Sequence, residues 1–250
     1  MKHESEWRPS KFEIRRGHWR ASTDRTEVGS SSRLMADCVA EAYETSVARF
    51  ASGRLIDLGC GSVPLYGIYR SHVNQITCVD WGEGLHLDLQ SDLSQPLSFD
   101  DQVFDTVVLS DVLEHIPNPD HLWSEIHRVL APGGYLIMNV PFFYWLHAQP
   151  HDYYRYTEFA LTRFAIENGF EIVELRALGG LGEVIADISA KLWSKVPIVG
   201  DSVAVAIQSM VRWLSRSRVG TRAAVVSAKN FPFAYFLVAQ RAMVRADSPG

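Results

Sequence analysis

Residues 54–61 read Arg54-Leu-Ile-Asp-Leu-Gly-Cys-Gly61, and this short stretch decides the fold. An apolar run that ends in glycines is typical of a buried strand that gives way to a tight turn. Glycines at such a turn let the backbone approach a ligand closely, and a following helix offers unpaired N–H groups. The third glycine of a dinucleotide fingerprint is replaced here by Val63. The stretch therefore indicates a ligand-binding turn and argues against binding of the NAD kind.

Strand and helix patterns alternate on both sides of this turn. Apolar residues at helical spacing occupy 34–50, and further helix-like segments cover 119–130 and 157–168. Additional strands are predicted over 76–80, 103–110, 135–140, 170–175 and 233–241. Such alternation predicts an α/β fold with a mostly parallel sheet and helices on both of its faces.

The two ends of the chain depart from this alternation. Residues 1–32 are polar and weakly patterned, which predicts a flexible N-terminal arm or lid in front of one domain over 33–250. Residues 181–222 carry two amphipathic helical stripes and are predicted to form a basic helical insertion before the last strand.

Composition limits the class of protein. The chain has 250 residues, of which 47% are hydrophobic, so it forms one large domain or two small ones and is not disordered. With 24 basic and 29 acidic residues the net charge is −5, which disfavours a nucleic-acid partner. The charge is uneven, because residues 191–250 hold nine Lys and Arg against two Asp. The body is acidic and the final region is basic.

Cysteine usage and the N-terminal residues bear on location. Cys38, Cys60 and Cys78 show no CxxC spacing, so a disulfide framework or a zinc knuckle is not expected. The first residues lack the apolar core of a signal peptide, and no run approaches the roughly 18 apolar residues that cross a bilayer. The sequence predicts a cytoplasmic protein.

Two acidic positions follow the glycine turn. Asp80 closes the next strand, where a carboxylate can accept both hydroxyls of an adenosine ribose. A solvated aspartate at a strand end is the alternative reading of Asp80. Asp92 and Leu93 come after a link too short for the usual crossover helix.

Taken in order, these blocks resemble the class I S-adenosylmethionine-dependent methyltransferases. The resemblance covers roughly residues 34–175 and includes the strand near 233–241; it implies a Rossmann-like seven-stranded sheet whose last strand is antiparallel. The matching blocks are Leu55-Ile-Asp-Leu-Gly-Cys-Gly61, Val79-Asp80, Asp92-Leu93, Phe104-Asp105, Leu113-Glu-His-Ile116 and Arg128-Val-Leu-Ala-Pro-Gly-Gly134.

The resemblance also implies roles for single residues. S-adenosylmethionine would be the cofactor. Gly59 and Gly61 would pass beneath its methionine part, Asp57 would lie near the amino group, Asp80 would hold the ribose, Asp92 and the Leu93 backbone would contact the adenine, and Ser110 would line the methionine end. Trp81 would either flank the adenine or cover the gap left by the short link, and we favour the cover.

Polar residues are dense after the fourth strand, beyond whose carboxyl end ligands bind in an open sheet. If Asp111-Val-Leu-Glu114-His115 begins a helical turn, its three polar side chains share one face. The pattern resembles the small-RNA 2′-O-methyltransferases, in which an acid-x-x-Glu-His turn and a later histidine hold magnesium. The matching later histidine is His147 or His151. We favour a form without metal, in which His151 or His115 is the base and Glu114 orients it.

A second dense segment follows the fifth strand. Its candidate substrate residues are His147, Asp152, Tyr153, Tyr154 and Arg155. Aromatic faces with hydrogen-bonding tips suit a polar, ring-shaped substrate such as a sugar. The segment also resembles methyltransferases encoded with bacterial surface-polysaccharide assembly enzymes. Alternatively, these residues pack against and cap the helix that begins near residue 157.

The expected function is O-methylation of a sugar or another polyhydroxylated acceptor, including a lipid-linked glycan. A quinone or small phenol is the alternative acceptor, and a regulatory relative that binds the cofactor without catalysis is the alternative class. Residues 181–222 would contact a membrane surface with anionic headgroups, pack on the domain, or pack on a second subunit in a homodimer. We favour packing, since amphipathic helices usually serve cores.

Overall fold

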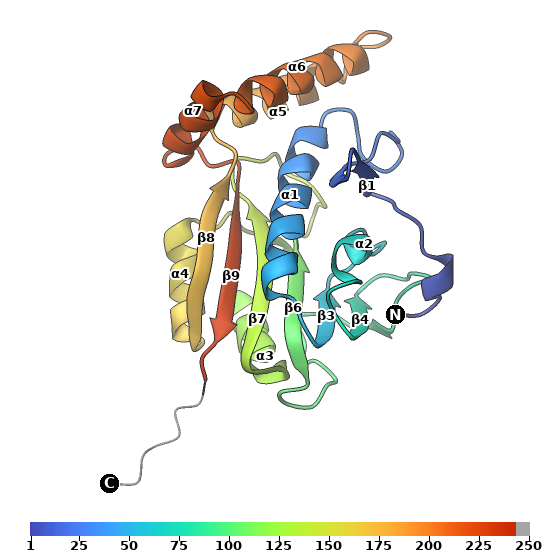
Figure 1. Ribbon diagram of the computed structural model, residues 1–250, viewed down its shortest axis with the longest axis vertical. Coiled ribbons are helices and arrows are strands. Elements are labelled where there is room, and N and C mark those ends of the chain that lie inside the picture. The colour runs from blue at the N-terminus through green and yellow to red at the C-terminus, as the bar shows by residue number, and fades with distance from the viewer. Residues whose placement is uncertain (244–250) are drawn as a thin grey trace.

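The computed structural model describes residues 1–243, and its centre is a seven-stranded sheet in the order β5-β4-β3-β6-β7-β9-β8 (Figure 1). Neighbours from β5 to β7 pair in parallel, whereas β9 is antiparallel to both β7 and β8. This confirms the predicted α/β, Rossmann-like sheet with an antiparallel last strand. The strands are β3 (Arg54–Leu58), β4 (Gln75–Asp80), β5 (Leu89–Gln90), β6 (Phe104–Ser110), β7 (Leu130–Pro141), β8 (Phe170–Leu178) and β9 (Ala234–Arg241). Residues 244–250 of the predicted domain lie outside the described residues.

Helices cover both faces of the sheet. Side chains alternate between the faces of a strand, so Leu55 and Ile56 of β3 enter two different apolar cores. One core contains α1 (Arg33–Phe50) and α2 (Tyr66–Tyr69), and the other contains α3 (Pro119–Val129) and α4 (Glu158–Glu167). As the sequence indicates, no crossover helix joins β4 to β5.

The N-terminal arm has defined structure in these residues. A 3-10 turn at Glu4–Glu6 precedes a hairpin of β1 (Phe12–Arg15) and β2 (His18–Ala21). Arg16 and Gly17 connect the two strands at φ 55° and 79°, as a two-residue hairpin turn requires. The hairpin lies beside the upper end of α1 in Figure 1, and Phe12 is buried in the same core as that helix. The action of the arm as a lid stays a prediction.

The insertion contains three helices: α5 (Leu181–Trp193), α6 (Gly200–Ser215) and α7 (Arg218–Ala228). It therefore extends beyond the predicted 181–222. The prediction did not include the third helix, none of whose residues is buried. The three helices lie together at the end of the sheet where the parallel strands terminate (Figure 1). Over residues 1–243, none of the helices has the length and apolarity to cross a membrane.

Candidate active site

The glycine turn bends sharply at the end of β3. The N–H groups of Gly59 and Cys60 both donate to the Val79 carbonyl, at 2.8 and 3.1 Å. Gly59 has φ 73°, and a Cβ there would lie 2.4 Å from a methyl carbon of Val112. A side chain is thus excluded by both conformation and space. The helix that follows, α2, is only four residues long, so the turn does not deliver the ordinary helix N-terminus that its pattern suggests.

Asp80 is fixed by the loops on either side of it. Its Oδ2 accepts the N–H of Gly61 at 2.8 Å, and its Oδ1 accepts the N–H of Gly82 at 2.9 Å. Each carboxylate oxygen can accept more than one hydrogen bond. Asp80 therefore positions the turn and still has acceptor capacity toward a ligand.

A cavity of about 380 Å³ lies over the carboxyl ends of these strands. Five of the predicted cofactor residues line it: Gly59, Asp80, Trp81, Asp92 and Leu93. Its other lining residues are Ser94, Asp111, Val112, His115, Ile116, Pro117, Ala148, His151 and Tyr153. One cavity therefore collects residues predicted separately as cofactor, catalytic and substrate contacts.

Three predicted cofactor residues lie outside that lining. Asp57 is buried and accepts the hydroxyl of Tyr69 at 2.8 Å, and its burial raises its pKa to about 7. Ser110 donates to Oδ1 of Asn139 at 2.8 Å. Gly61 has φ 52° with open space where a Cβ would lie. The hydrogen bonds of Asp57 and Ser110 therefore hold the turn and the strand ends in place.

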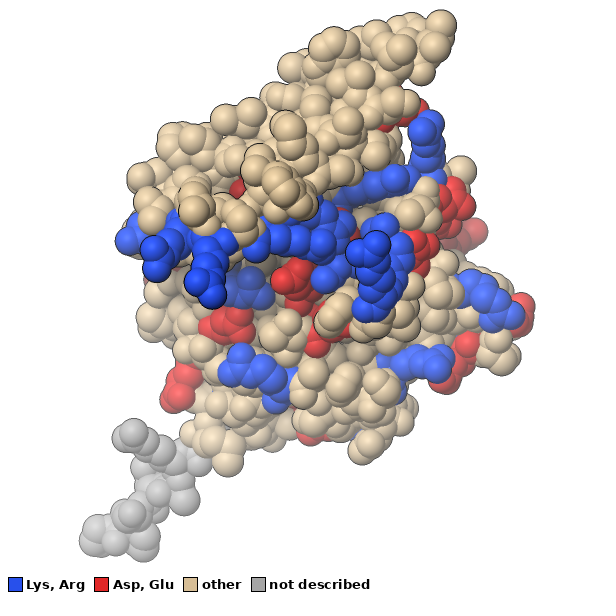
Figure 2. All heavy atoms as spheres, turned by 45° about the horizontal axis from the view of Figure 1, so that its top comes forward, with Lys and Arg blue, Asp and Glu red and all other residues tan. Residues whose placement is uncertain are grey.

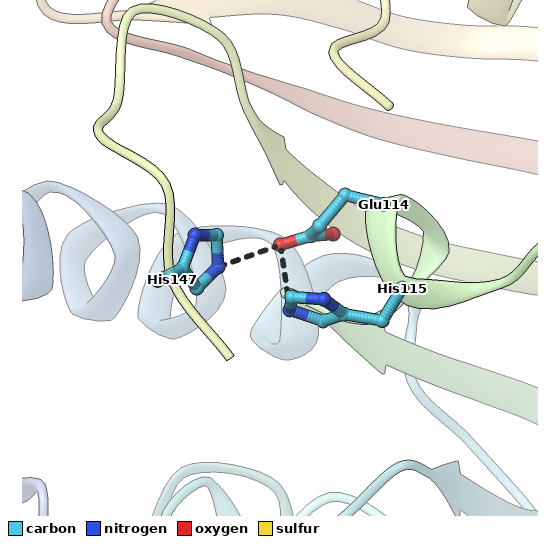
Figure 3. Close-up of side chains that lie close together, drawn as sticks. All are labelled: Glu114, His115 and His147. Atoms are coloured by element: carbon cyan, nitrogen blue, oxygen red, sulfur yellow. Dashed lines mark ion pairs between the residues drawn. The ribbon is translucent and has the colours of Figure 1, made fainter. Parts of the chain in front are cut away.

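Glu114, His115 and His147 form the polar centre of the site (Figure 3). The Glu114 side chain is fully buried, and its Oε1 lies 3.6 Å from Nε2 of each histidine. Neither carboxylate oxygen of Glu114 has a hydrogen-bond partner. Burial raises the pKa of Glu114, and the contact with Glu114 raises the pKa of His147.

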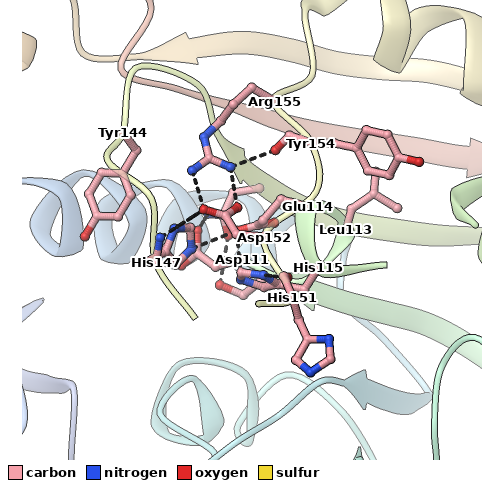
Figure 4. Close-up of polar contacts among 12 residues, drawn as sticks. Asp111, Leu113, Glu114, His115, Tyr144, His147, His151, Asp152, Tyr154 and Arg155 are labelled. Carbon is pink, nitrogen blue, oxygen red and sulfur yellow. Dashed lines mark hydrogen bonds and ion pairs between the residues drawn. The ribbon is translucent and has the colours of Figure 1, made fainter. Parts of the chain in front are cut away.

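The outer nitrogens of both rings are held by other groups. His115 Nδ1 lies 2.6 Å from the His151 carbonyl oxygen, and His147 Nδ1 lies 3.4 Å from Oδ2 of Asp152. These partners place a proton on each Nδ1, so Nε2 of a neutral ring turns its lone pair toward Glu114, whereas Nε2 of a protonated ring donates toward it. Arg155 donates to both oxygens of Asp152 at 2.6 and 2.9 Å and lowers the pKa of that carboxyl to about 2 (Figure 4). Asp152 and Arg155, predicted as substrate contacts, lie behind His147 and orient it.

The cluster fits a divalent metal ion. Its three ligand atoms lie within 4.8 Å of one another, and the carboxylate has no other partner. Support of each Nδ1 by a carbonyl or carboxylate is the usual arrangement behind a metal-bound imidazole. Among the ligands suggested by the sequence, the structure brings together Glu114, His115 and His147.

Asp111 and His151 lie apart from this group. Asp111 has φ 53°, which breaks the helical face expected for 111–115, and its carboxylate contacts Lys11 at 3.3 Å and Asn139 at 2.6 Å. The His151 ring packs on Trp81 with centroids 5.0 Å apart. Its Nδ1 lies 3.1 Å from the hydroxyl of Tyr153, and both residues line the cavity of about 380 Å³. Tyr154 is exposed and donates to the Pro117 carbonyl.

A second cavity, of about 240 Å³, adjoins the first. Asp111 and His115 line both cavities and so form a shared wall. The other lining residues are Lys11, Glu27, Val28, Gly29, Ser32, Met35, Ala36, Val39, Pro141, Tyr144 and His147. Sequence reasoning did not identify Lys11 or Glu27, because the arm has no periodicity or motif that would distinguish them.

Residues 56–138 match the family model described as a methyltransferase domain. A ubiquinone biosynthesis O-methyltransferase of Pseudomonas syringae pv. tomato is 28% identical over 107 residues, which are 37% of this chain and 46% of that protein. A phosphatidylethanolamine N-methyltransferase of Cereibacter sphaeroides is 32% identical over 100 residues, 34% of this chain and 49% of that protein. The matches span about half the length of these curated relatives.

Solved structures agree with the fold over most of the chain. The [4+2]-cyclase SpnF has a TM-score of 0.56 at 19% identity and covers 84% of this chain and 82% of its own. An S-adenosylmethionine-dependent methyltransferase of Mesorhizobium loti has a TM-score of 0.53 at 15% identity, with 83% and 100% covered. Residues 56–138 thus match a methyltransferase domain, and the described residues have the fold of these solved structures.

Proposed function

We propose that this chain is an S-adenosylmethionine-dependent O-methyltransferase. The cofactor would occupy the 380 Å³ cavity, and the acceptor would occupy the 240 Å³ cavity. The observation that carries the proposal is the wall of Asp111 and His115 shared by the two cavities. Methyl transfer is an in-line displacement, in which the acceptor attacks the methyl carbon from the side opposite the leaving sulfur. The protein contributes chiefly by holding donor and acceptor in this arrangement.

The lining of the second cavity favours a sugar or another polyhydroxylated acceptor. Lys11, Glu27 and His147 offer donors and acceptors for several hydroxyl groups, while Val28 and Val39 provide an apolar side for a ring. A lipid-linked glycan belongs to this class. The alternative is a quinone or small phenol, supported by the apolar lining and by the similarity to a ubiquinone biosynthesis O-methyltransferase.

Two forms of catalysis fit the cluster. A divalent ion held by Glu114, His115 and His147 would lower the pKa of an acceptor hydroxyl. Without metal, His147 or His115 would take the hydroxyl proton while Glu114 and Asp152 orient the rings. The partnerless carboxylate of Glu114 supports the metal form, in contrast to the preference drawn from the sequence. His151 would then contact the cofactor side of the site.

In the decisive experiment the protein is incubated with tritiated S-adenosylmethionine and cell extracts, and the label is then measured in separate fractions. Label in a glycan fraction supports the sugar acceptor, and label in the lipid extract supports a quinone or a phenol. The absence of transfer to any fraction, with cofactor bound, would favour the regulatory relative and refute the enzyme. Calorimetric titration with Mn²⁺ tests the metal separately, because His147→Ala should abolish a binding step that His72→Ala, at an exposed histidine outside both cavities, retains.

We further propose that α5–α7 contact a membrane surface with anionic headgroups. Large apolar side chains are exposed throughout these helices, at Ile185, Ile188, Leu192, Trp193, Ile198, Met210, Trp213, Val219, Val225 and Val226. The charged residues of these helices and their links that are exposed are all basic: Lys195, Arg216, Arg218, Arg222 and Lys229, while the half-buried Asp201 pairs with Arg25. Figure 2 shows Lys and Arg gathered in a band along the edge of a surface that is largely free of charged side chains.

This combination suits a lipid surface better than a second copy of the chain. A two-fold interface places the same patch on both sides, so the basic side chains would face each other. Apolar burial together with anionic headgroups satisfies both kinds of side chain. Wild-type protein should float with phosphatidylglycerol vesicles at low salt, and Ile198→Asp with Trp213→Ser should remain in solution. Equal flotation of the wild type and this double variant would refute the membrane contact, and a dimer in sedimentation would favour the second copy.

A further inference from the structure

A third cavity, of about 180 Å³, lies away from the methyltransferase site between the N-terminal hairpin, the start of α1 and α6. Its lining contains three arginines and one carboxylate. The residues are Arg15, Ser30, Arg33, Leu34, Asp37, Val205, Gln208, Ser209 and Arg212. The lining is therefore positively charged.

Several donors around this cavity have no acceptor. Gln208 is 4% exposed, and its Oε1 accepts the Leu34 N–H at 2.8 Å, whereas its Nε2 is buried without a hydrogen-bond partner. The Nε atoms of Arg15 and Arg33 are also buried without one. Buried donors are nearly always satisfied in folded proteins, so three in one lining call for an acceptor.

The carboxylates nearby are already engaged. Asp37 accepts the Ala21 N–H at 2.9 Å and a charged hydrogen bond from Arg212. Glu13, outside the lining, lies 3.4 Å from the Arg15 Nε and accepts the N–H of Thr23, which follows β2, at 3.1 Å. Burial, followed by the charges of neighbouring arginines, lowers the pKa of Arg212 to about 10. Arg15 and Arg212 thus pair with Glu13 and Asp37, whereas Arg33 has no carboxylate partner among the described residues, which leaves one uncompensated positive charge.

We propose that the cavity binds a phosphate group. A tetrahedral anion offers acceptors in several directions, and the planar guanidinium forks of arginine match phosphate oxygens well. The group could belong to a phospholipid headgroup, since Arg212 and Gln208 lie on the same helix as the exposed Trp213, or to a water-soluble phosphate compound. The shared chemistry is the phosphate, and the two sources are separated below.

Two substitutions test the site without breaking the pair of Asp37 and Arg212. Arg33→Gln removes one donor, and its remaining contact is a hydrogen bond from the guanidinium to the Thr23 carbonyl. Gln208→Glu keeps the acceptor for the Leu34 N–H and places a carboxylate oxygen where the partnerless Nε2 lies. The new carboxylate should accept the hydrogen bonds that phosphate would otherwise accept. Arg222→Gln on α7 is the matched control, because it removes an exposed arginine outside the cavity.

Phosphate binding is measured by calorimetric titration of the full chain with inorganic phosphate. A second titration with S-adenosylmethionine shows whether each variant is folded. We expect about tenfold weaker phosphate binding in Arg33→Gln, no binding in Gln208→Glu, and wild-type binding in Arg222→Gln. The Gln208→Glu protein should melt no lower than the wild type. No phosphate binding by the wild type, or wild-type binding by Gln208→Glu, would overturn the proposal.

Vesicles separate the two sources of phosphate. Arg33→Gln and Arg222→Gln each remove one positive charge, and Arg222 lies in the proposed membrane contact, so without a headgroup site Arg33→Gln should lose no more flotation than Arg222→Gln. A greater loss of flotation with phosphatidylglycerol vesicles in Arg33→Gln, at the same salt concentration, assigns the site to a lipid headgroup. An equal or smaller loss in Arg33→Gln, with phosphate binding weakened only in that variant, assigns it to a soluble compound.

Discussion

Replacing Asp80 by Asn should weaken S-adenosylmethionine binding strongly while preserving the size of the side chain. In the folded protein both carboxylate oxygens accept a backbone N–H, from Gly61 and from Gly82. An amide has only one acceptor atom, so its NH₂ group must face one of these two donors. The substitution therefore loses a charged acceptor for the ribose and also disturbs one loop.

The magnitude follows from the number and kind of hydrogen bonds. A hydrogen bond to a charged group contributes about 1.5–3 kcal/mol, and two ribose hydroxyls share this carboxylate. Because paired bonds are not additive, we expect a loss of about 2–3 kcal/mol, or roughly 30- to 150-fold in dissociation constant. Asp92 is exposed at the edge of the same cavity, and Asp92→Asn should cost about 1 kcal/mol or less.

Titration calorimetry with S-adenosylmethionine measures both variants, and thermal melting shows whether each is folded. Asp101→Asn serves as the control, since this carboxylate pairs with Arg128 far from the cavity. Unchanged affinity in a folded Asp80→Asn protein would show that the ribose does not contact this carboxylate. A larger effect at Asp92 than at Asp80 would also refute the assignment.

Four other substitutions probe the Glu114 cluster, the second cavity and the glycine turn. Glu114→Gln removes the group that raises the pKa of His147, so in the form without metal the rise of turnover with pH should move to lower pH. In the form with metal, the same substitution should abolish Mn²⁺ binding. Titration of the His147 ring by NMR tests the first outcome, and calorimetry with Mn²⁺ tests the second. Lys11→Met should change stability by only about 0.5 kcal/mol, as its ion pair is partly exposed, yet raise the KM for the acceptor and leave that for the cofactor. Gly59→Ala should cost about 2–4 kcal/mol in urea unfolding, and Gly61→Ala, with open space for a Cβ, about 1–2 kcal/mol; equal costs would contradict the close packing at the first glycine.

The sheet was predictable because its determinants are local. The apolar strand at 54–58 and the acid at the end of the next strand identify these two strands through hydrophobic pattern and turn chemistry, while the seven-stranded sheet and its antiparallel last strand were implied by the family resemblance. Helix α7 could not be predicted this way, since Val219, Val225 and Val226 face outward and leave no buried stripe. Its place depends on contacts with α5 and α6 that no local pattern encodes.

The site was predictable in its composition and less so in its pairing. Sequence spacing placed Asp111 with Glu114 and His115 on one helical face, but the left-handed conformation of Asp111 turns its carboxylate toward Lys11. The choice between His147 and the later histidine rested on a loop whose path is set by Asp152 and Arg155. Loop paths depend on tertiary contacts, and these cannot be read from spacing alone.

The division of the lining residues has a consequence for the order of events in turnover. The cofactor cavity is lined from Gly59 onward, whereas Lys11, Glu27 and Gly29 of the arm border the second cavity. With the cofactor and the acceptor placed as proposed, cofactor exchange would require no displacement of the arm, while acceptor exchange would depend on its position. Spent cofactor would then leave while a long acceptor stays bound, so the expected kinetic regime is repeated methylation of one chain without release.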